Sequence, residues 1–142
     1  MPIRRSRLAA LTLAAALAAF TAAPACAERF RLCARGGGMD CVVDGDTFWL
    51  DGQKIRVADI DTPETHRPQC PAERAWGQRA TGRLLALLNA GAFSLEPVER
   101  DRDRYGRALR VVTRNGRSLG AMLVKEGLAR PWTGARQPWC RS

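Results

Sequence analysis

Six carboxylates and one arginine fall within residues 43–64, which read V-D-G-D-T-F-W-L-D-G-Q-K-I-R-V-A-D-I-D-T-P-E. Asp51 belongs to an Asp-Gly turn signal, and the five that could do chemistry are Asp44, Asp46, Asp59, Asp61 and Glu64. Carboxylate oxygens held at strand ends are ligands for a hard divalent cation, although Asp and Gly are also common in turns for conformational reasons alone. Arg56 inside this stretch, and Arg107 in a distant D-R-Y-G-R motif, favour the chemical interpretation.

Asp46 and Asp61, with the backbone carbonyl of Thr62, are the candidate metal ligands in this stretch. Oxygen ligands favour Ca²⁺, with Mg²⁺ or another divalent cation as the alternative, and the lack of clustered His or Cys ligands argues against zinc. Few protein ligands suffice where a substrate phosphate supplies another. The stretch therefore predicts a divalent-cation site that faces a phosphate.

Two arginines and one glutamate supply the remaining chemistry. The guanidinium groups of Arg56 and Arg107 can each meet two phosphoryl oxygens at once. Glu64 follows a proline that stiffens the turn, and it can hold or deprotonate a water for attack on phosphorus. With a cation to neutralise charge in the transition state, these groups predict the hydrolysis of a phosphodiester.

The spacing of Arg56 and Asp61 imposes a geometric requirement. They lie five residues apart, so strict strand alternation would point them to opposite faces of a sheet. A bulge or strong bend must separate them, and Ala58–Asp59 is the expected place.

The elements that position these residues follow from patterning. We expect strands at 47–50, 54–60, 93–98 and 109–113, helices at 72–89 and 118–126, a charged loop at 99–107 and an irregular tail after residue 129. An apolar stripe along the first helix consists of Ala72, Trp76, Ala80, Leu84 and Leu88. Short strands with an inserted helix predict an α+β, mainly β chain that forms a small Greek-key barrel of the OB type.

The first 27 residues have the basic, apolar and small-residue order of a secretory signal peptide, with cleavage expected after Ala27. A lipoprotein acylated at Cys26 is the weaker alternative. The apolar run is too short to span a membrane, so we expect one exported domain at 28–142. That domain would be periplasmic or extracellular, monomeric and without stable membrane association.

Four cysteines follow the leader, and an even number in an exported chain predicts two disulfides. The preferred pairs are Cys33–Cys41, which closes a glycine loop, and Cys70–Cys140, which ties the tail to the body. A Cys₄ metal site would need Cys-x-x-Cys pairs, which the sequence lacks.

The chain has a formal net charge of +9, most of it from arginine, and it stays basic without the leader. A basic exported domain suggests a polyanionic partner, either nucleic acid or an anionic envelope. Charge alone leaves both open.

Three motifs, V-D-G-D-T, R-V-A-D-I-D-T-P-E and D-R-Y-G-R, occur in this order between about Cys41 and Arg130. In order and spacing they resemble the staphylococcal nuclease (thermonuclease) family. The resemblance implies a five-stranded OB-fold barrel with two to three helices. It also implies a Ca²⁺-dependent endonuclease that cleaves single- or double-stranded DNA and RNA and leaves 3′-phosphate ends.

The resemblance also assigns roles to residues. Its metal ligands fall on Asp46, Asp61 and the Thr62 carbonyl, and its catalytic residues fall on Arg56, Glu64 and Arg107. An acidic position near the metal falls on Asp44, and a position that contacts the phosphate falls on Tyr105. Trp132 and Thr133 stand where the family has base-stacking tyrosines; Trp132 can substitute, because any aromatic face can stack on a base.

Three features depart from the family pattern. Asp59 replaces an apolar or small residue and would alter the choice of metal ion if it faced the metal. His66 follows the family motif and is most simply an exposed loop residue. The paired cysteines and the Trp-rich tail are additions. The alternative function is a non-catalytic OB module that binds nucleic acid or another polyanion; a purely structural Ca²⁺ site would leave both arginines unexplained.

Overall fold

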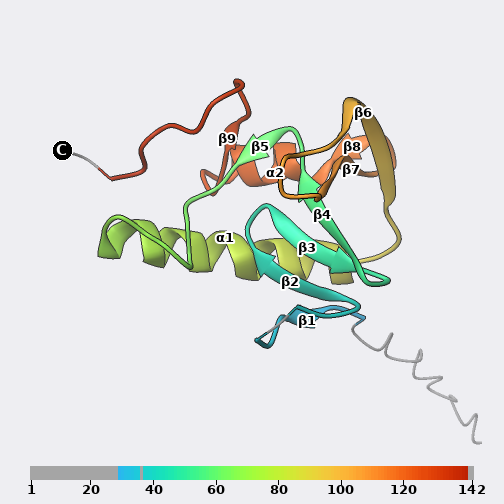
Figure 1. The fold of residues 1–142 in the computed structure, drawn as a ribbon, viewed down its shortest axis with the longest axis horizontal. Helices are drawn as coiled ribbons and strands as arrows, with labels where there is room; N and C mark the ends of the chain where they lie inside the picture. The colour runs from blue at the N-terminus through green and yellow to red at the C-terminus, as the bar shows by residue number, and fades with distance from the viewer. Residues whose placement is uncertain (1–28, 36, 141–142) are drawn as a thin grey trace, which may run out of the picture.

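Strands and two helices make up the computed structural model, which describes residues 29–35 and 37–140 (Figure 1). The expected signal peptide therefore lies outside the described residues. Among the residues described, no helix is both long enough and apolar enough to cross a membrane. The strands are β1 Arg31–Leu32, β2 Cys41–Asp44, β3 Thr47–Leu50, β4 Gln53–Val57, β5 Ile60–Asp61, β6 Ser94–Arg102, β7 Ala108–Arg114, β8 Arg117–Ser118 and β9 Arg130–Pro131, and the helices are α1 Pro71–Asn89 and α2 Leu119–Lys125.

The strands β2, β3 and β4 form an antiparallel meander with the two acidic turns at its ends. In the β3–β4 turn, Asp51 and Gly52 both have positive φ, 49° and 78°, as a tight hairpin turn requires. In the β2–β3 turn the register shifts between Val42 and Asp44. Beyond that irregularity Asp44 pairs with Thr47, and Asp46 lies in the turn between them.

A parallel pairing between β4 and β7 brings the two arginine motifs together. Ile55 pairs with Ala108 and Arg56 with Leu109. Arg107 immediately precedes β7, so it lies beside the strand that carries Arg56. The strand pairing alone therefore places two guanidinium groups, distant in sequence, on neighbouring strands.

The acidic β2–β3 turn packs against the helix α1. That helix packs against β2, and α2 packs against β7 and α1. At Gly45, between the two acidic residues of the turn, a Cβ atom would lie 2.7 Å from the Cβ atom of Ala80 in α1. The β2–β3 turn can rest on α1 only because residue 45 has no side chain.

The predicted fold class, mainly β with two helices and an OB-type arrangement, is confirmed. The principal sheet has the order β1-β2-β3-β4-β7-β6, with β8 on β7, and β5 pairs with β9 in a second, two-stranded sheet. The described strands surround one core, but their pairing does not close into a ring. Both expected disulfides are present, Cys33–Cys41 and Cys70–Cys140.

Four local predictions need correction. The strand predicted at 54–60 is interrupted at residues 58 and 59, and β6 continues through Arg102 into the predicted charged loop. On α1, Ala72 is exposed and Trp76 half-buried, whereas Glu73 and Gly77 are buried. The loop before α1 packs on that side of the helix, so the first turns bury a different face from the one the stripe predicts. In α2, the apolar residues Leu119, Met122 and Leu123 predict an inward-facing side, but Met122 is exposed.

Candidate active site

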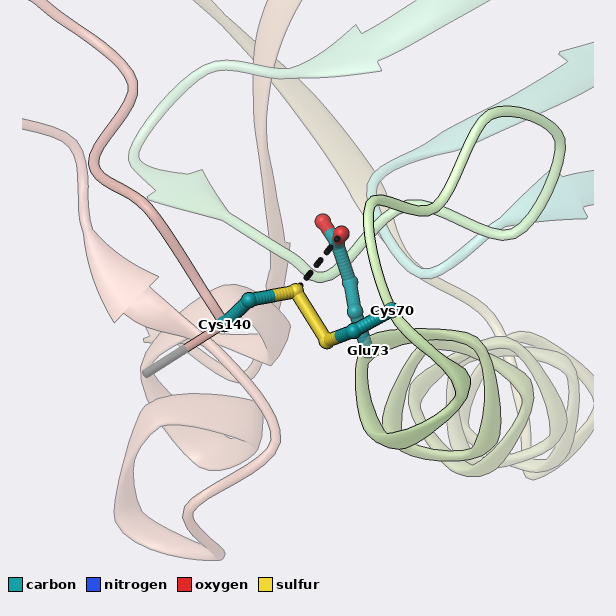
Figure 2. Close-up of side chains that lie close together, drawn as sticks. All are labelled: Cys70, Glu73 and Cys140. Carbon is teal, nitrogen blue, oxygen red and sulfur yellow. Dashed lines mark hydrogen bonds between the residues drawn. A yellow bond between two sulfur atoms is a disulfide. The ribbon is translucent and has the colours of Figure 1, made fainter. Parts of the chain in front are cut away.

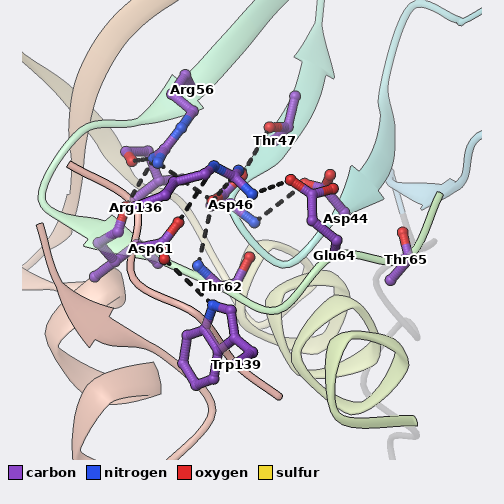
Figure 3. Close-up of polar contacts among 12 residues, drawn as sticks. Asp44, Asp46, Thr47, Arg56, Asp61, Thr62, Glu64, Thr65, Arg136 and Trp139 are labelled. Carbon is purple, nitrogen blue, oxygen red and sulfur yellow. Dashed lines mark hydrogen bonds and ion pairs between the residues drawn. The ribbon is translucent and has the colours of Figure 1, made fainter. Parts of the chain in front are cut away.

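Asp46, in the β2–β3 turn, and Asp61, at the end of β5, are both buried and lie in one cluster of polar side chains (Figure 3). Asp46 belongs to the β2–β3 turn; its Oδ1 accepts a hydrogen bond from the Thr47 hydroxyl at 2.9 Å. Its Oδ2 accepts one from the backbone N–H of Thr62 at 3.4 Å, which ties the turn to the residue after β5. The structure thus brings the three predicted metal ligands into one buried cluster.

Arg56 is buried in β4 and directs its guanidinium at the same cluster. Its Nη1 donates to the carbonyl oxygens of Val57 and, at 2.9 Å, of Ile60. Its Nη2 lies 3.4 Å from Oδ2 of Asp46, and the two side chains are 6% and 1% exposed. Arg56 therefore links the turn between β4 and β5 to the acidic β2–β3 turn.

The bend expected at Ala58–Asp59 is present as a turn between β4 and β5. The backbone N–H of Ala58 donates to the carbonyl of Arg110, which fixes the turn on β7. Because the chain changes direction there, Arg56 and Asp61 do not follow the alternation of one strand. This turn removes the conflict that their five-residue spacing creates.

Arg107 approaches from the β6–β7 loop. Its Nε donates to Oδ2 of Asp103 at 2.6 Å, and its Nη1 donates to the Thr47 hydroxyl at 3.3 Å. Since that hydroxyl donates to Asp46, a chain of hydrogen bonds runs from Arg107 through Thr47 to the acidic cluster. Asp103 also accepts the backbone N–H groups of Tyr105 and Arg107, so it shapes the loop as well as holding the guanidinium.

Glu64 lies on a loop that is seated on the start of α1. The buried carboxylate of Glu73 accepts the backbone N–H groups of Glu64 at 3.2 Å and Gln69 at 2.7 Å. At Gly77 a Cβ atom would lie 2.7 Å from the carbonyl oxygen of Pro63, so the loop needs a glycine beneath it. Glu73 and Gly77 together fix the backbone from which Glu64 projects.

The Cys70–Cys140 disulfide lies beside Glu73, which holds the Glu64 loop (Figure 2). The sulfur of Cys140 is 3.6 Å from the Glu73 carboxylate. The disulfide brings the end of the chain next to the first turn of α1. As a result, the segment before Cys140 returns to the acidic cluster.

Arg136, in that returning segment, contacts three of the predicted site residues. Its Nε lies 3.6 Å from Oδ1 of Asp61, its Nη2 lies 3.9 Å from Oδ2 of Asp46, and its Nη1 pairs with Oε1 of Glu64. Burial lowers the pKa of Arg136, but the negative charges of these three residues outweigh it and raise the pKa above its ordinary value.

Burial and neighbouring charges perturb two carboxyl groups. Burial, followed by the charge of Asp46, raises the pKa of Asp44 to about 7. Burial also raises the pKa of Asp61, and the charge of Arg136 only partly offsets it. Both shifts favour the protonated carboxyl group, and burial is the largest cause of each.

A pocket of about 960 Å³ opens beside the cluster and is lined by the three predicted catalytic side chains together with Tyr105, Trp132 and Arg136. Tyr105 is 68% exposed, with the Arg107 guanidinium 5.5 Å from its ring centroid. Trp132 is 40% exposed, and the Arg56 guanidinium lies 5.4 Å from its ring centroid. Both aromatic rings are thus accessible at the wall of a pocket that has cationic groups around it.

Asp59 and His66 do not join the acidic cluster. Oδ2 of Asp59 accepts the Ser118 hydroxyl at 2.6 Å, at the start of α2. His66 is exposed and contacts the neighbouring Thr65 hydroxyl. Of the late tryptophans, Trp139 is buried rather than on the surface, and its Nε1 donates to Oδ2 of Asp61 at 3.3 Å.

The donor set around Asp46 and Asp61 fits a hard cation. Oδ1 of Asp61 is buried and accepts no hydrogen bond within the described chain, although Nε of Arg136 faces it as an ion pair at 3.6 Å. In the same part of the chain, the only three acidic or sulfur ligand atoms that all lie within 4.8 Å of one another belong to Cys70, Glu73 and Cys140. Both sulfurs of that group are in the disulfide, so it is no thiolate site.

Four residues that contact the predicted site residues were not predicted from the sequence: Thr47, Glu73, Asp103 and Arg136. Asp103 has a detectable signal, since an Asp two residues before a Tyr-Gly turn often caps its own backbone. The expected Cys70–Cys140 disulfide would also have placed Arg136 near the start of α1. Thr47 and Glu73 have no such signal.

Known proteins are similar in sequence to this chain. The family model described as "Staphylococcal nuclease homologue" matches residues 54–139. The chain is 40% identical over 97 residues to "Endonuclease YncB" of Bacillus subtilis, which covers 65% of this chain and 46% of that protein. It is 37% identical over 93 residues to the "Thermonuclease" of Staphylococcus hyicus, which covers 63% of this chain and 54% of that protein.

A longer match is to "Micrococcal nuclease" of Shigella flexneri, with 36% identity over 139 residues, 88% of this chain and 71% of that protein. By contrast, the chain spans only about half the length of the endonuclease and of the thermonuclease. The similarity therefore covers this domain, and not the whole of those two relatives.

Proposed function

The chain belongs to the staphylococcal nuclease family, and we propose that it is an endonuclease that hydrolyses phosphodiester bonds of DNA and RNA with a divalent cation, Ca²⁺ in the first instance. The observation that supports this most strongly is the convergence of Arg56, Arg107 and Glu64 on one pocket beside the buried carboxylates of Asp46 and Asp61. A module that only binds polyanions has no need for that arrangement.

Each side chain has a role that follows from its surroundings. Arg56 and Arg107 bind the phosphate from two sides and stabilise the charge that develops on it. Glu64, on its seated loop, holds a water and accepts its proton. The expected products carry 3′-phosphate ends.

The cation would be held by Asp46, Asp61 and the carbonyl of Thr62. When bound, it would supply Lewis-acid stabilisation of the phosphoryl oxygens. The buried Oδ1 of Asp61 and the all-oxygen donor set support this assignment.

The pocket wall suggests how the nucleotide binds. Tyr105 would contact the phosphate next to Arg107, and Trp132 would offer a stacking face for a base. The two disulfides fit an exported protein, and we propose that the domain acts as a monomer outside the cytoplasm, periplasmic or extracellular, without stable membrane association.

A nuclease assay on the purified, oxidised protein tests the proposal. We expect it to degrade single-stranded DNA and RNA with added Ca²⁺ and to stop when the cation is chelated. On DNA blocked by a dye at its 5′ end, phosphatase treatment should change the gel mobility of the dye-labelled products if they end in 3′-phosphates, and should leave it unchanged if they end in 3′-hydroxyls. Activity that persists at full strength with chelator would rule out the metal-assisted mechanism.

Glu64→Gln is the informative variant, because it removes the base and keeps the side-chain size. Glu96→Gln is a matched control on an exposed carboxylate of β6. We expect the first to lose roughly 10²–10⁴-fold in rate and the second to keep the wild-type rate. Salt-sensitive binding of DNA without turnover, in wild type and in both variants, would instead favour the non-catalytic binding module.

A further inference from the structure

The tail, residues 132–140, is fixed across the acidic cluster by contacts at its end. The Cys70–Cys140 disulfide anchors it, and Trp139 packs edge-on against Trp76 with ring centroids 5.2 Å apart. Trp139 donates to Asp61, and the guanidinium of Arg130 lies 3.6 Å from the Trp139 ring centroid. The tail is therefore part of the folded domain and holds Arg136 at a defined place.

All three guanidinium nitrogens of Arg136 face carboxylates, each a different one (Figure 3). These residues are Asp46, Asp61 and Glu64, of which two are predicted metal ligands and one is the predicted base. A guanidinium that served only the substrate would leave N–H groups directed at the pocket. Arg136 instead lies where a cation shared by the three residues would lie.

Charge accounts for this arrangement. The Asp46 and Asp61 side chains are 1% and 4% exposed, and Arg136, 42% exposed, bridges them on the solvent side. Buried carboxylates repel one another, and a positive charge among them offsets the energetic cost of that repulsion. Arg136 supplies that charge from the chain itself, alongside Arg56.

A divalent cation bound by Asp46, Asp61 and Glu64 would occupy the place of the Arg136 guanidinium, whereas Arg56 contacts only Asp46 among these three residues. A divalent cation and a guanidinium within a few ångströms of each other repel strongly, and both need the same carboxylate lone pairs. The oxygens of Asp46, Asp61 and Glu64 also do not all lie within 4.8 Å of one another in the described structure. They would have to draw together around a metal ion once the larger guanidinium left.

We propose that Arg136 is a built-in counter-ion that competes with the divalent cation for Asp46, Asp61 and Glu64. The cation binds by displacing the Arg136 side chain toward solvent, and the tail backbone stays anchored by the disulfide. Cation affinity is then set by this competition as well as by the ligands. The proposal rests on the cation site of the proposed function.

Calorimetric titration of metal-stripped protein with Ca²⁺ tests the competition directly. We expect R136Q to lower the dissociation constant for Ca²⁺ by roughly tenfold, because the displaced charge is gone. The matched control is R117Q, at an exposed arginine of β8 that lines neither pocket and has no ion pair within the described residues. It removes the same net charge and should change the constant by less than about twofold, since screening weakens distant charges.

Urea unfolding provides a readout that does not depend on activity. Without cation, R136Q should unfold at a lower urea concentration than wild type, because its carboxylates lack a counter-ion. With saturating Ca²⁺ the two midpoints should converge, so the cation-induced shift is larger for R136Q.

The outcomes separate the two proposals. Equal or weaker Ca²⁺ binding by R136Q than by wild type overturns the competition and leaves the cation site standing. Absence of Ca²⁺ binding by wild type, R136Q and R117Q alike overturns the cation site and the competition with it.

Discussion

Arg56 and Arg107 reach the same pocket from contrasting surroundings. Arg56, in the middle of the sheet, is 6% exposed and donates to two backbone carbonyls as well as facing Asp46. Arg107, at the end of the β6–β7 loop, is 20% exposed and bonds mainly to Asp103, four residues away in its own turn. One guanidinium is held by the fold and the other by a local turn.

This difference shows how the site divides its work. The contacts of Arg56 join β4, β5 and the β2–β3 turn, so the side chain is part of what holds these elements together. Within the described residues, the Arg107 side chain bonds to the acidic turn through Thr47 and otherwise to Asp103 of its own loop.

The largest expected effect is a loss of hydrolysis rate, and it is the same for both arginines. Arg56→Gln and Arg107→Gln should each reduce the rate of DNA hydrolysis by roughly 10³-fold, because each removes charge aimed at the transition state. Steady-state assays at saturating Ca²⁺ measure this, with Arg117→Gln as the control for net charge. A loss of less than tenfold for either variant would remove that residue from the proposed mechanism.

The next largest effect is a loss of stability, and it differs between Arg56 and Arg107. Arg56→Gln should lower the free energy of unfolding by about 3 kcal/mol, because buried acceptors and Asp46 lose their donor. Arg107→Gln should cost less than about 1 kcal/mol, as expected for a partly exposed pair. Urea unfolding compares both with wild type, and equal losses would contradict the distinction between fold-held and loop-held arginines.

A smaller effect concerns the partner of Arg107. Asp103→Asn keeps the shape of the side chain but weakens its hold on the guanidinium, so activity should fall by roughly tenfold. If Asp103 acts through Arg107, adding Asp103→Asn to Arg107→Gln should cause little further loss. Additive losses in this double-mutant cycle would show that Asp103 acts independently.

The smallest effect is a pH dependence. Burial raises the pKa of Asp103, but hydrogen bonds from the Arg107 side chain and the Arg107 and Tyr105 backbone outweigh it, so the pKa is lowered. This stabilisation is complete above the ordinary pKa of about 3.9 and is lost as pH falls through the lower folded-state value. The stability difference between wild type and Asp103→Asn, about 0.5 kcal/mol at neutral pH, should therefore vanish in acid, as unfolding at pH 2 to 6 would reveal.

Local pattern was a good guide to part of the molecule. The strand at Thr47–Leu50 and the helix that begins after Ser118 follow the predicted positions, and the Ser118 hydroxyl caps the helix by accepting the N–H of Ala121. Turn residues and caps act through neighbours in the chain, so their effects are visible in sequence. The apolar stripe of α1 was less reliable, because a loop packs over its first turns and buries Glu73 and Gly77.

The sequence by itself determined the chemical inventory: the carboxylates, the two arginine motifs, the cysteine pairs and the strands that carry them. Only the tertiary structure decided which groups meet. The sequence predicts the bend at Ala58–Asp59 and the Cys70–Cys140 disulfide, but the pairing of β4 with β7 and the contacts of the tail place Arg107 and Arg136 beside the acidic turn, 61 and 90 residues after Asp46. These contacts depend on the packing of the whole core, and no local pattern in the chain encodes which side chains they bring together.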